Sequence, residues 1–261
     1  MKNLKVLLAD PRHTGLLTHS NYVPIGIGYI GAHLLKSLEN TAKIDLELYT
    51  DPDEIFDRIE KWKPDIVGIS NYMWNASLSN YICEFTKKLD PNILCVLGGP
   101  EFPAGTGAKY IKNTNENDTF DKCFKYLSER PSVDYFAWSD GEVAFTEIVQ
   151  RFIEADCSVE LLKSKDTPMK GSASMSKDKK ELLVGAYIPR IGMSGSIKAH
   201  GRDIIPSPYT SGLLDKFLDG KFIPCFETAR GCPFMCTFCD QGLDESKMTS
   251  HSNLRMYEEL M

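Results

Sequence analysis

Four short apolar runs and one alternating segment, separated by segments with apolar residues at helical spacing, constrain the fold of this chain most. The runs predict strands at residues 5–9, 65–70, 93–97 and 133–137, and the alternation predicts a further strand at 44–49. The segments between and after them predict helices at 27–38, 53–62, 77–89 and 143–154. Strands made mostly of unbroken apolar residues are typical of a parallel sheet that is covered by helices on both faces. We therefore expect an α/β, doubly wound parallel-sheet domain over residues 1–155.

The rest of the chain does not continue this alternation. Residues 105–129 are polar and predict a surface insertion with one helix. Residues 156–210 are rich in Ser, Lys, Gly and Pro and predict a linker or hairpin region, with 164–180 as a flexible linker or hairpin tip. A short helix at 211–218, a new strand at 221–226 and a helix at 252–261 are predicted in the third region, 211–261.

The composition is that of an ordinary soluble globular protein. Hydrophobic residues make up 42% and charged residues 25% of the 261 residues, and the formal net charge is −6. This charge gives no support for nucleic acid as the main partner. The first apolar run is too short for a signal sequence or a membrane span. We therefore expect cytoplasmic localisation, and we interpret the eight cysteines as thiols or metal ligands rather than disulfides.

Three of the cysteines lie close together, at Cys232, Cys236 and Cys239. Three thiolates on one loop can bind three irons of a [4Fe–4S] cluster, and the fourth iron is then open to another ligand. The alternative is a structural zinc site, which needs four ligands. Cys225, Asp240 or His251 could supply a fourth ligand, but no second cysteine pair is present.

The segment 223–239, IPCFETARGCPFMCTFC, resembles the first strand and cluster loop of radical S-adenosylmethionine (SAM) enzymes. The resemblance implies that Cys232, Cys236 and Cys239 hold the cluster and that SAM chelates the open iron. Reductive cleavage of SAM would then yield a 5′-deoxyadenosyl radical that abstracts hydrogen from the substrate. Glu227 and Arg230 precede the loop, and their role in bracing it or in the site is open.

Several loops follow predicted strands and meet at one edge of the predicted sheet, where doubly wound domains bind their ligands. With Asp65–Ser70, Leu97-Gly98-Gly99 and Asp140-Gly141-Glu142, the first domain is similar to the cobalamin-binding (Rossmann-like) domain of B12-dependent radical SAM proteins. The resemblance implies that Ser70, Gly98 and Gly99 line the slot for the nucleotide tail of cobalamin. We also place Gly141 and Glu142 among the cofactor-binding residues.

One motif departs from the pattern of cobalamin domains. Some of them use Asp-x-His-x-x-Gly to supply a histidine to cobalt, whereas here His13 comes one place late after Asp10. We therefore interpret His13 as an ordinary loop histidine. Met73 and Trp74 could face the corrin, but we interpret them as core or rim residues.

The resemblance implies a cobalamin-dependent radical SAM enzyme that acts in methyl transfer or a related radical rearrangement of a small-molecule or lipid substrate. A flavodoxin-like or ferredoxin-like protein would supply the electron, and neither nucleic acid nor a membrane span is expected. The alternatives are a tRNA-modifying methylthiotransferase and a cobalamin-binding module without catalysis. Few residues follow Cys239, so we expect residues 211–261 to be an incomplete start of a radical SAM (βα) barrel and this chain alone to be inactive. No catalytic residue is assigned.

Overall fold

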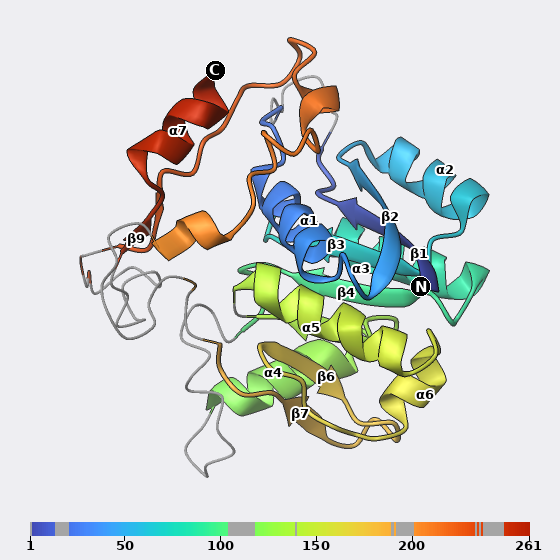
Figure 1. Cartoon of the computed structure of the whole chain (residues 1–261). Coiled ribbons are helices and arrows are strands. Elements are labelled where there is room, and N and C mark those ends of the chain that lie inside the picture. The colour runs from blue at the N-terminus through green and yellow to red at the C-terminus, as the bar shows by residue number, and fades with distance from the viewer. Residues whose placement is uncertain are drawn as a thin grey trace.

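A seven-stranded sheet forms the centre of the protein (Figure 1). This computed structural model describes residues 2–13, 21–103, 118–138, 140–188, 191, 201–232, 234, 236 and 248–261. The strand order is β2-β1-β3-β4-β5-β6-β7. The strands are β1 (Lys2–Ala9), β2 (Ala42–Tyr49), β3 (Ile66–Ser70), β4 (Leu94–Gly98), β5 (Tyr135–Ala137), β6 (Ser172–Met175) and β7 (Leu182–Val184). The first five strands are parallel, which confirms the predicted doubly wound sheet, and the last two are antiparallel.

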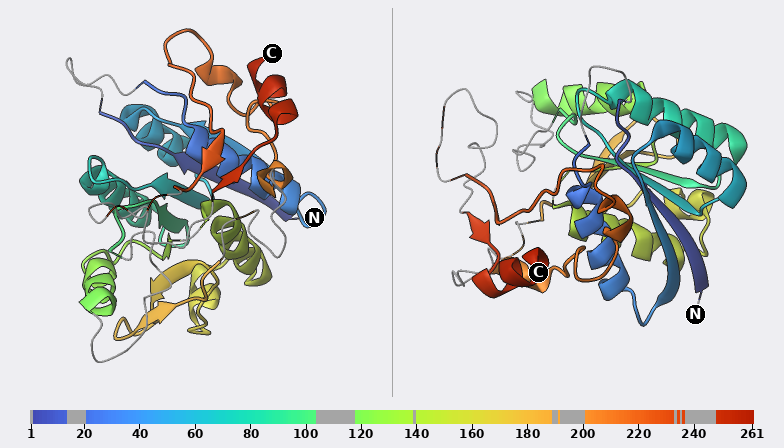
Figure 2. Two further views of the ribbon diagram at one scale, coloured as in Figure 1. Left: turned by 90° about the vertical axis from the view of Figure 1, so that its left-hand side faces the viewer. Right: turned by 90° about the horizontal axis from the view of Figure 1, so that it is seen from above.

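Helices cover both faces of this sheet (Figure 2). The helices are α1 (Ile25–Ser37), α2 (Pro52–Trp62), α3 (Ala76–Leu89), α4 (Asp118–Ser128), α5 (Gly141–Glu154), α6 (Val159–Lys163) and α7 (Asn253–Leu260). Because successive side chains of a strand point to opposite faces, Leu7 joins the core that α2, α3 and α4 cover, whereas Leu8 joins the core under α1, α5 and α6. Helices α1 and α5 pack against each other, and their N-terminal ends lie at one edge of the sheet.

The start of α2 shows how a short polar residue fixes an element. Asp51 Oδ1 accepts hydrogen bonds from the backbone N–H groups of Asp53 and Glu54, at 2.9 and 3.2 Å. These two N–H groups have no partner within the helix, so the carboxylate satisfies them and also complements the helix dipole. The helix ends at Trp62, and the C-cap residue Lys63 has a left-handed φ of 51°.

The sheet extends beyond the first 155 residues. Strands β6 and β7 form a hairpin, and β6 pairs antiparallel with β5, so part of the segment predicted as a flexible linker or hairpin tip is a strand of the sheet. The segment from Ser172 to Met175 is buried throughout. Two of its four residues are serines, so the strand carries no apolar run that could have marked it.

Two predicted elements near the cysteine loop differ from the structure. The expected strand at 221–226 is a single parallel bridge between Ile223 and Tyr22. Pro224 has no N–H with which to extend a ladder. The expected helix at 211–218 is a 3₁₀ turn at Asp215–Phe217, because Gly212 takes a left-handed φ of 74°. Helix α7 confirms the prediction at 252–261, with Ser252 as its N-cap.

The predicted insertion at 105–129 contains α4, while its first part, residues 105–117, lies outside the described residues. Of the helices that the structure describes, none has both the length and the apolar character needed to cross a membrane.

Candidate functional site: a pocket at the carboxyl ends of the strands

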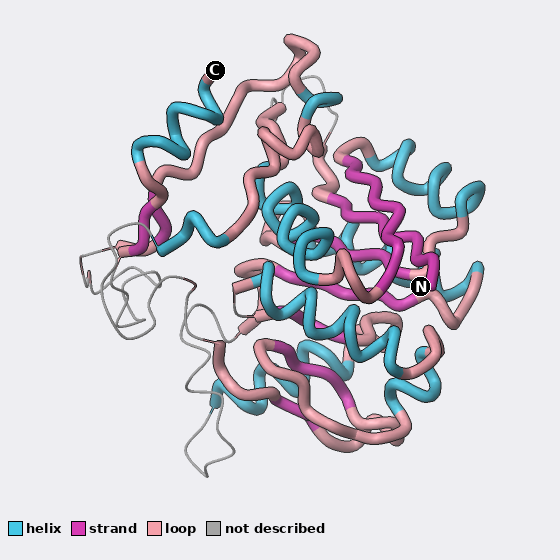
Figure 3. The backbone as a smooth tube through the Cα atoms, viewed as in Figure 1, coloured by secondary structure: helices cyan, strands magenta, loops and turns pink. Residues whose placement is uncertain are grey.

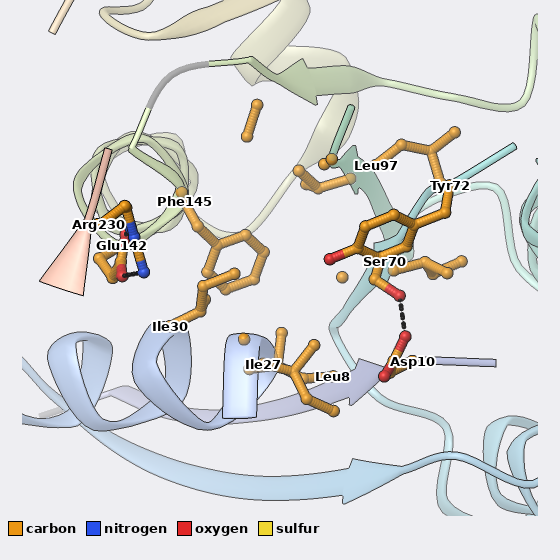
Figure 4. A pocket seen from close by; sticks show the side chains of 18 residues that line it. Leu8, Asp10, Ile27, Ile30, Ser70, Tyr72, Leu97, Glu142, Phe145 and Arg230 are labelled. Atoms are coloured by element: carbon orange, nitrogen blue, oxygen red, sulfur yellow. Dashed lines mark hydrogen bonds and ion pairs between the residues drawn. The ribbon is translucent and has the colours of Figure 1, made fainter. Parts of the chain in front are cut away.

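A pocket of about 270 Å³ opens where the parallel strands end (Figure 4). All five residues predicted to bind a cofactor line it: Ser70, Gly98, Gly99, Gly141 and Glu142. They come from the ends of β3 and β4 and from the start of α5. In the order β2-β1-β3-β4-β5, strand β2 lies on one side of β1, whereas β3 and the parallel strands after it lie on the other side. Open α/β sheets bind ligands at such a switch in strand order, here between β1 and β3. Their role as cobalamin contacts stays a prediction.

Gly98 is the last residue of β4 and Gly99 follows it, and the two glycines have different structural roles. A Cβ atom on Gly99 would lie 2.5 Å from the backbone oxygen of Asn71, and its φ of 135° is unfavourable for other residues. The fold itself therefore requires glycine at position 99, whether or not a ligand is bound. A Cβ atom on Gly98 would be 3.3 Å from the backbone oxygen of Ala137, which needs only a small adjustment. Gly98 is therefore the position at which a side chain can be tested as an obstacle to a ligand.

A polar group closes one end of the pocket. The Ser70 hydroxyl donates a hydrogen bond to Asp10 Oδ1. The other oxygen of Asp10 pairs with Arg12 Nη2 at 2.7 Å. Asp10 directly follows β1, and Ser70 is the last residue of β3. The polar residues at this end of the pocket therefore come from two neighbouring strands.

Most of the remaining wall is apolar. Leu8 and Leu97 come from the sheet, Ile27 from α1 and Phe145 from α5 (Figure 4). Tyr72 also lines the pocket, and burial raises the pKa of its hydroxyl, with Asp10 adding to the effect. A flat apolar ligand edge can be buried here, while polar groups are available at both ends of the pocket.

The structure also shows where Met73, Trp74 and His13 lie, which were interpreted from the sequence as core, rim or loop residues. Trp74 stacks on Tyr72 with ring centroids 4.6 Å apart, yet its side chain is 59% exposed, and that of Met73 is 79% exposed. Both therefore lie at the surface and not in the core. His13 Nε2 lies 2.5 Å from the backbone oxygen of Trp74, so this ring nitrogen donates a hydrogen bond to the loop after β3.

A cluster of charged residues forms the other end of the pocket. Arg230 reaches Glu142 through two contacts, Nη2 to Oε1 at 2.9 Å and Nη1 to Oε2 at 3.1 Å. It also donates through Nε to Glu227 at 3.1 Å and lies 3.5 Å from Asp140. Arg202, whose side chain is fully buried, lies 3.1 Å from Glu227 and 3.5 Å from Glu142.

The electrostatics of this cluster follow from burial and from the pairing of opposite charges. Burial alone would raise the pKa of Glu142, but Arg230 and Arg202 outweigh it and hold that pKa below its ordinary value. Burial and the neighbouring charge of Glu142 raise the pKa of Asp140. Burial alone would lower the pKa of Arg230, but Glu142 and Glu227 raise it overall. Glu142 and Arg230 are therefore a charged pair inside the protein.

The predicted cluster cysteines are only partly described. Cys232 is half-buried and Cys236 is exposed, whereas Cys239 lies outside the described residues. Two short antiparallel strands precede and follow the cysteine segment, β8 (Ala229–Arg230) and β9 (Thr249–Ser250). We call β8 and β9 the stem. Figure 3 draws the strands of the stem in magenta. The structure thus brings the segment with Cys232 next to the pocket, because Arg230 belongs to both the stem and the pocket wall.

Sequence reasoning missed several residues of this site. Asp10 and Tyr72 lie in loops that the sequence placed at this end of the strands, but neither residue was assigned to the site. Arg202 lies in the segment predicted as a linker, and no local pattern marks it as buried.

Part of the chain that forms this pocket is similar to a known protein family. Residues 17–114 match the family model described as the B12 binding domain. This segment of the chain therefore resembles a B12 binding domain. The matched segment contains β2, β3 and β4 and therefore Ser70, Gly98 and Gly99.

Similarity to other proteins extends beyond residues 17–114. The chain is 27% identical over 203 residues to the cobalamin-dependent radical SAM methyltransferase TokK of Streptomyces tokunonensis, which covers 76% of this chain and 24% of that protein. It is 27% identical to an uncharacterized methyltransferase of Pyrococcus horikoshii over 100% of this chain and 50% of that protein. The chain thus spans half or less of the length of these relatives, and it is related to the B12-binding radical SAM proteins.

A solved structure shares the fold. The cobalamin-dependent SAM radical enzyme OxsB, with aqua-cobalamin and SAM bound, superimposes with a TM-score of 0.61 at 17% identity. The match covers 98% of this chain and 31% of that chain. At this identity the likeness concerns the fold.

Proposed function

We propose that this chain binds cobalamin in the pocket at the carboxyl ends of the strands and a [4Fe–4S] cluster on Cys232, Cys236 and Cys239. Together they would serve radical SAM methyl transfer or a related radical rearrangement of a small-molecule or lipid substrate. The observation that carries the proposal is the shared position of Arg230. It lines the pocket together with Ser70 and Gly98, and it lies two residues before Cys232.

The residues of the pocket suit cobalamin, and the three cysteines suit an iron–sulfur cluster. The pocket offers apolar walls, a glycine whose missing side chain leaves room, and polar groups at both ends, as the heterocyclic tail of cobalamin requires. Thiols are the ligands of iron–sulfur clusters, and three of them leave one iron open. When bound, the cluster supplies the electron that cleaves SAM, and cobalamin supplies a carrier for the transferred group.

The residues of the chain have separate tasks in this proposal. Gly98 and the apolar wall admit the ligand and exclude water from it. Ser70, with its proton directed at Asp10, offers lone pairs to a donor on the ligand. Arg230 and Glu142 keep the cysteine segment beside the pocket. The family match favours this function over a methylthiotransferase, because its residues 17–114 match a B12 binding domain.

The test is the loading of the 261-residue chain with each group. Hydroxocobalamin titrated into the chain should show saturable binding with one molecule per chain in the visible spectrum. Anaerobic reconstitution should yield about four irons and four sulfides per chain, with a spectrum typical of [4Fe–4S]. Stoichiometric zinc without sulfide would refute the cluster, and the absence of saturable binding would refute the cobalamin site. Cobalamin binding without any cluster would favour the binding module without catalysis.

A further inference from the structure

We propose that Arg230 is a positioning residue that couples the two cofactor sites, so that cobalamin in the pocket and the cluster on the cysteine segment stabilise each other. This inference rests on the proposed function, because it concerns how the two sites communicate. It assigns to Arg230 and Glu142 a role beyond lining the pocket.

The first step is the geometry of the pair. Both terminal nitrogens of Arg230 meet both oxygens of Glu142, at 2.9 and 3.1 Å. Such a two-point contact fixes the orientation of the guanidinium as well as its distance. Glu142 is only 2% exposed and belongs to the first turn of α5, which is a rigid element of the core. The contact therefore fixes Arg230 relative to the sheet.

The second step is the short connection to the cysteines. Only Gly231 separates Arg230 from Cys232, and its φ of 107° makes a turn that other residues rarely adopt. A movement of Arg230 in the pocket wall is therefore passed on to Cys232 over one residue. A ligand that fills the pocket restricts Arg230, and a cluster that binds Cys232 restricts it from the other side.

The third step is a second attachment at the far end of the cysteine segment. His251 directly follows β9 and stacks on Tyr29 of α1, with ring centroids 5.8 Å apart. Its Nδ1 lies 3.2 Å from Asp203 Oδ1. The stem is thus attached to α5 through Arg230 and to α1 through His251, and these are the two helices whose N-terminal ends line the pocket.

The fourth step concerns what remains when Arg230 is replaced. Arg202 is buried between Glu142 and Glu227, at 3.5 and 3.1 Å. These carboxylates therefore keep one buried cation if Arg230 becomes neutral. We expect Arg230→Met to fold and to lose only the link to the stem.

The experiment measures the affinity of the full chain for hydroxocobalamin before and after cluster reconstitution. In the wild type the cluster should tighten cobalamin binding by about 5-fold or more, which is the lower range of known coupling between sites. In Arg230→Met the two affinities should agree within about 2-fold, although each group still binds. Arg230→Lys keeps the charge but not the two-point contact, and it should recover part of the coupling. Arg151→Met is the matched control, because Arg151 lies on α5 and pairs only with surface residues Glu147 and Glu154 among the ion pairs described.

Wild-type coupling in Arg230→Met would overturn the inference, and so would the absence of coupling in a wild type that binds both groups. If the wild type binds neither group, the proposed function fails instead, and hydrogen exchange of the cofactor-free chain then tests the attachment. Amides at 228–230 and 249–251 should exchange faster in Arg230→Met than in Arg151→Met, and equal exchange would overturn the attachment. If Arg230→Met does not fold, Glu142→Gln replaces it, with the same expected loss of coupling.

Discussion

At one end of the pocket the Ser70 hydroxyl donates a hydrogen bond to Asp10 Oδ1, with 2.5 Å between the two oxygens. A hydroxyl has a single proton, so Ser70 can meet a ligand only as an acceptor. Arg12 occupies the other oxygen of Asp10 and keeps the carboxylate in place. The selectivity of this end of the pocket therefore depends on a residue outside the matched segment 17–114, namely Asp10.

Replacing Ser70 by Ala should weaken hydroxocobalamin binding about 5-fold, which corresponds to about 1 kcal/mol for one neutral hydrogen bond. The fold should be unaffected, because the backbone bonds of β3 do not involve the hydroxyl. A spectroscopic titration measures the affinity, and Ser128→Ala on the surface helix α4 is the control. An affinity equal to that of the control would exclude Ser70 as a ligand contact.

Gly98→Leu should abolish cobalamin binding, because the new side chain would enter the pocket that Gly98 lines. Gly98→Ala should retain most of the binding, since its Cβ atom would lie at 3.3 Å from its nearest neighbour. The pair of variants separates loss of space from loss of the fold, which circular dichroism monitors. If Gly98→Leu binds cobalamin as the wild type does, the ligand lies elsewhere.

Gly99→Ala should instead destabilise the fold by about 1–3 kcal/mol, the cost of a residue forced into a rare backbone conformation. Its Cβ atom would lie 2.5 Å from the oxygen of Asn71, and φ is 135°. Urea unfolding of Gly98→Ala and Gly99→Ala side by side measures the difference. Equal stability of the two variants would contradict this reading of the Gly-Gly pair.

Cys236→Ala should prevent assembly of the [4Fe–4S] cluster, because two thiolates cannot replace three. Cys225→Ala is the matched control: this half-buried thiol precedes the segment and is not among the three predicted ligands. Iron and sulfide analysis after anaerobic reconstitution gives the answer. Loss of bound metal in both variants would instead indicate a zinc site that includes Cys225.

The stability of the protein should fall as the pH is lowered through the region where histidine titrates. Burial against α5 lowers the pKa of His33 below its ordinary 6.5, and nearby Glu142 only partly opposes this effect. Between the lowered pKa and about 6.5 the unfolded chain binds a proton that the native chain does not. The free energy of unfolding should therefore decrease as the pH falls from above 6.5 through the lowered pKa.

His33→Gln should make that decrease smaller, because the variant has no group to titrate at this position. The measurement is urea unfolding at pH 7.5, 6.5 and 5.5 for wild type and variant. The same pH dependence in both proteins would show that His33 is not the source.

Local sequence patterns predicted the parallel sheet and its helices because each element carries its own signal, such as the apolar run of β3 or the Asp51 cap of α2. The position of the pocket followed from the rule that ligands bind at the ends of the strands. Hairpin β6–β7 was not predicted as part of the sheet, since its buried serines are stabilised by pairing with β5 and not by their own hydrophobicity. The pairs of Arg230 and Arg202 with Glu142 join residues far apart in the chain, and no local pattern encodes such contacts.

The two outer strands of the sheet bear on how this protein behaves at high concentration. Edge strands expose unpaired backbone groups that invite pairing between molecules, and short length or charged side chains oppose it. Outer strand β7 has only three residues and follows the charged turn at Asp178–Lys180. At the other margin, β2 places Lys43, Asp45 and Glu47 at alternate positions. Self-association by strand addition is therefore disfavoured at both margins.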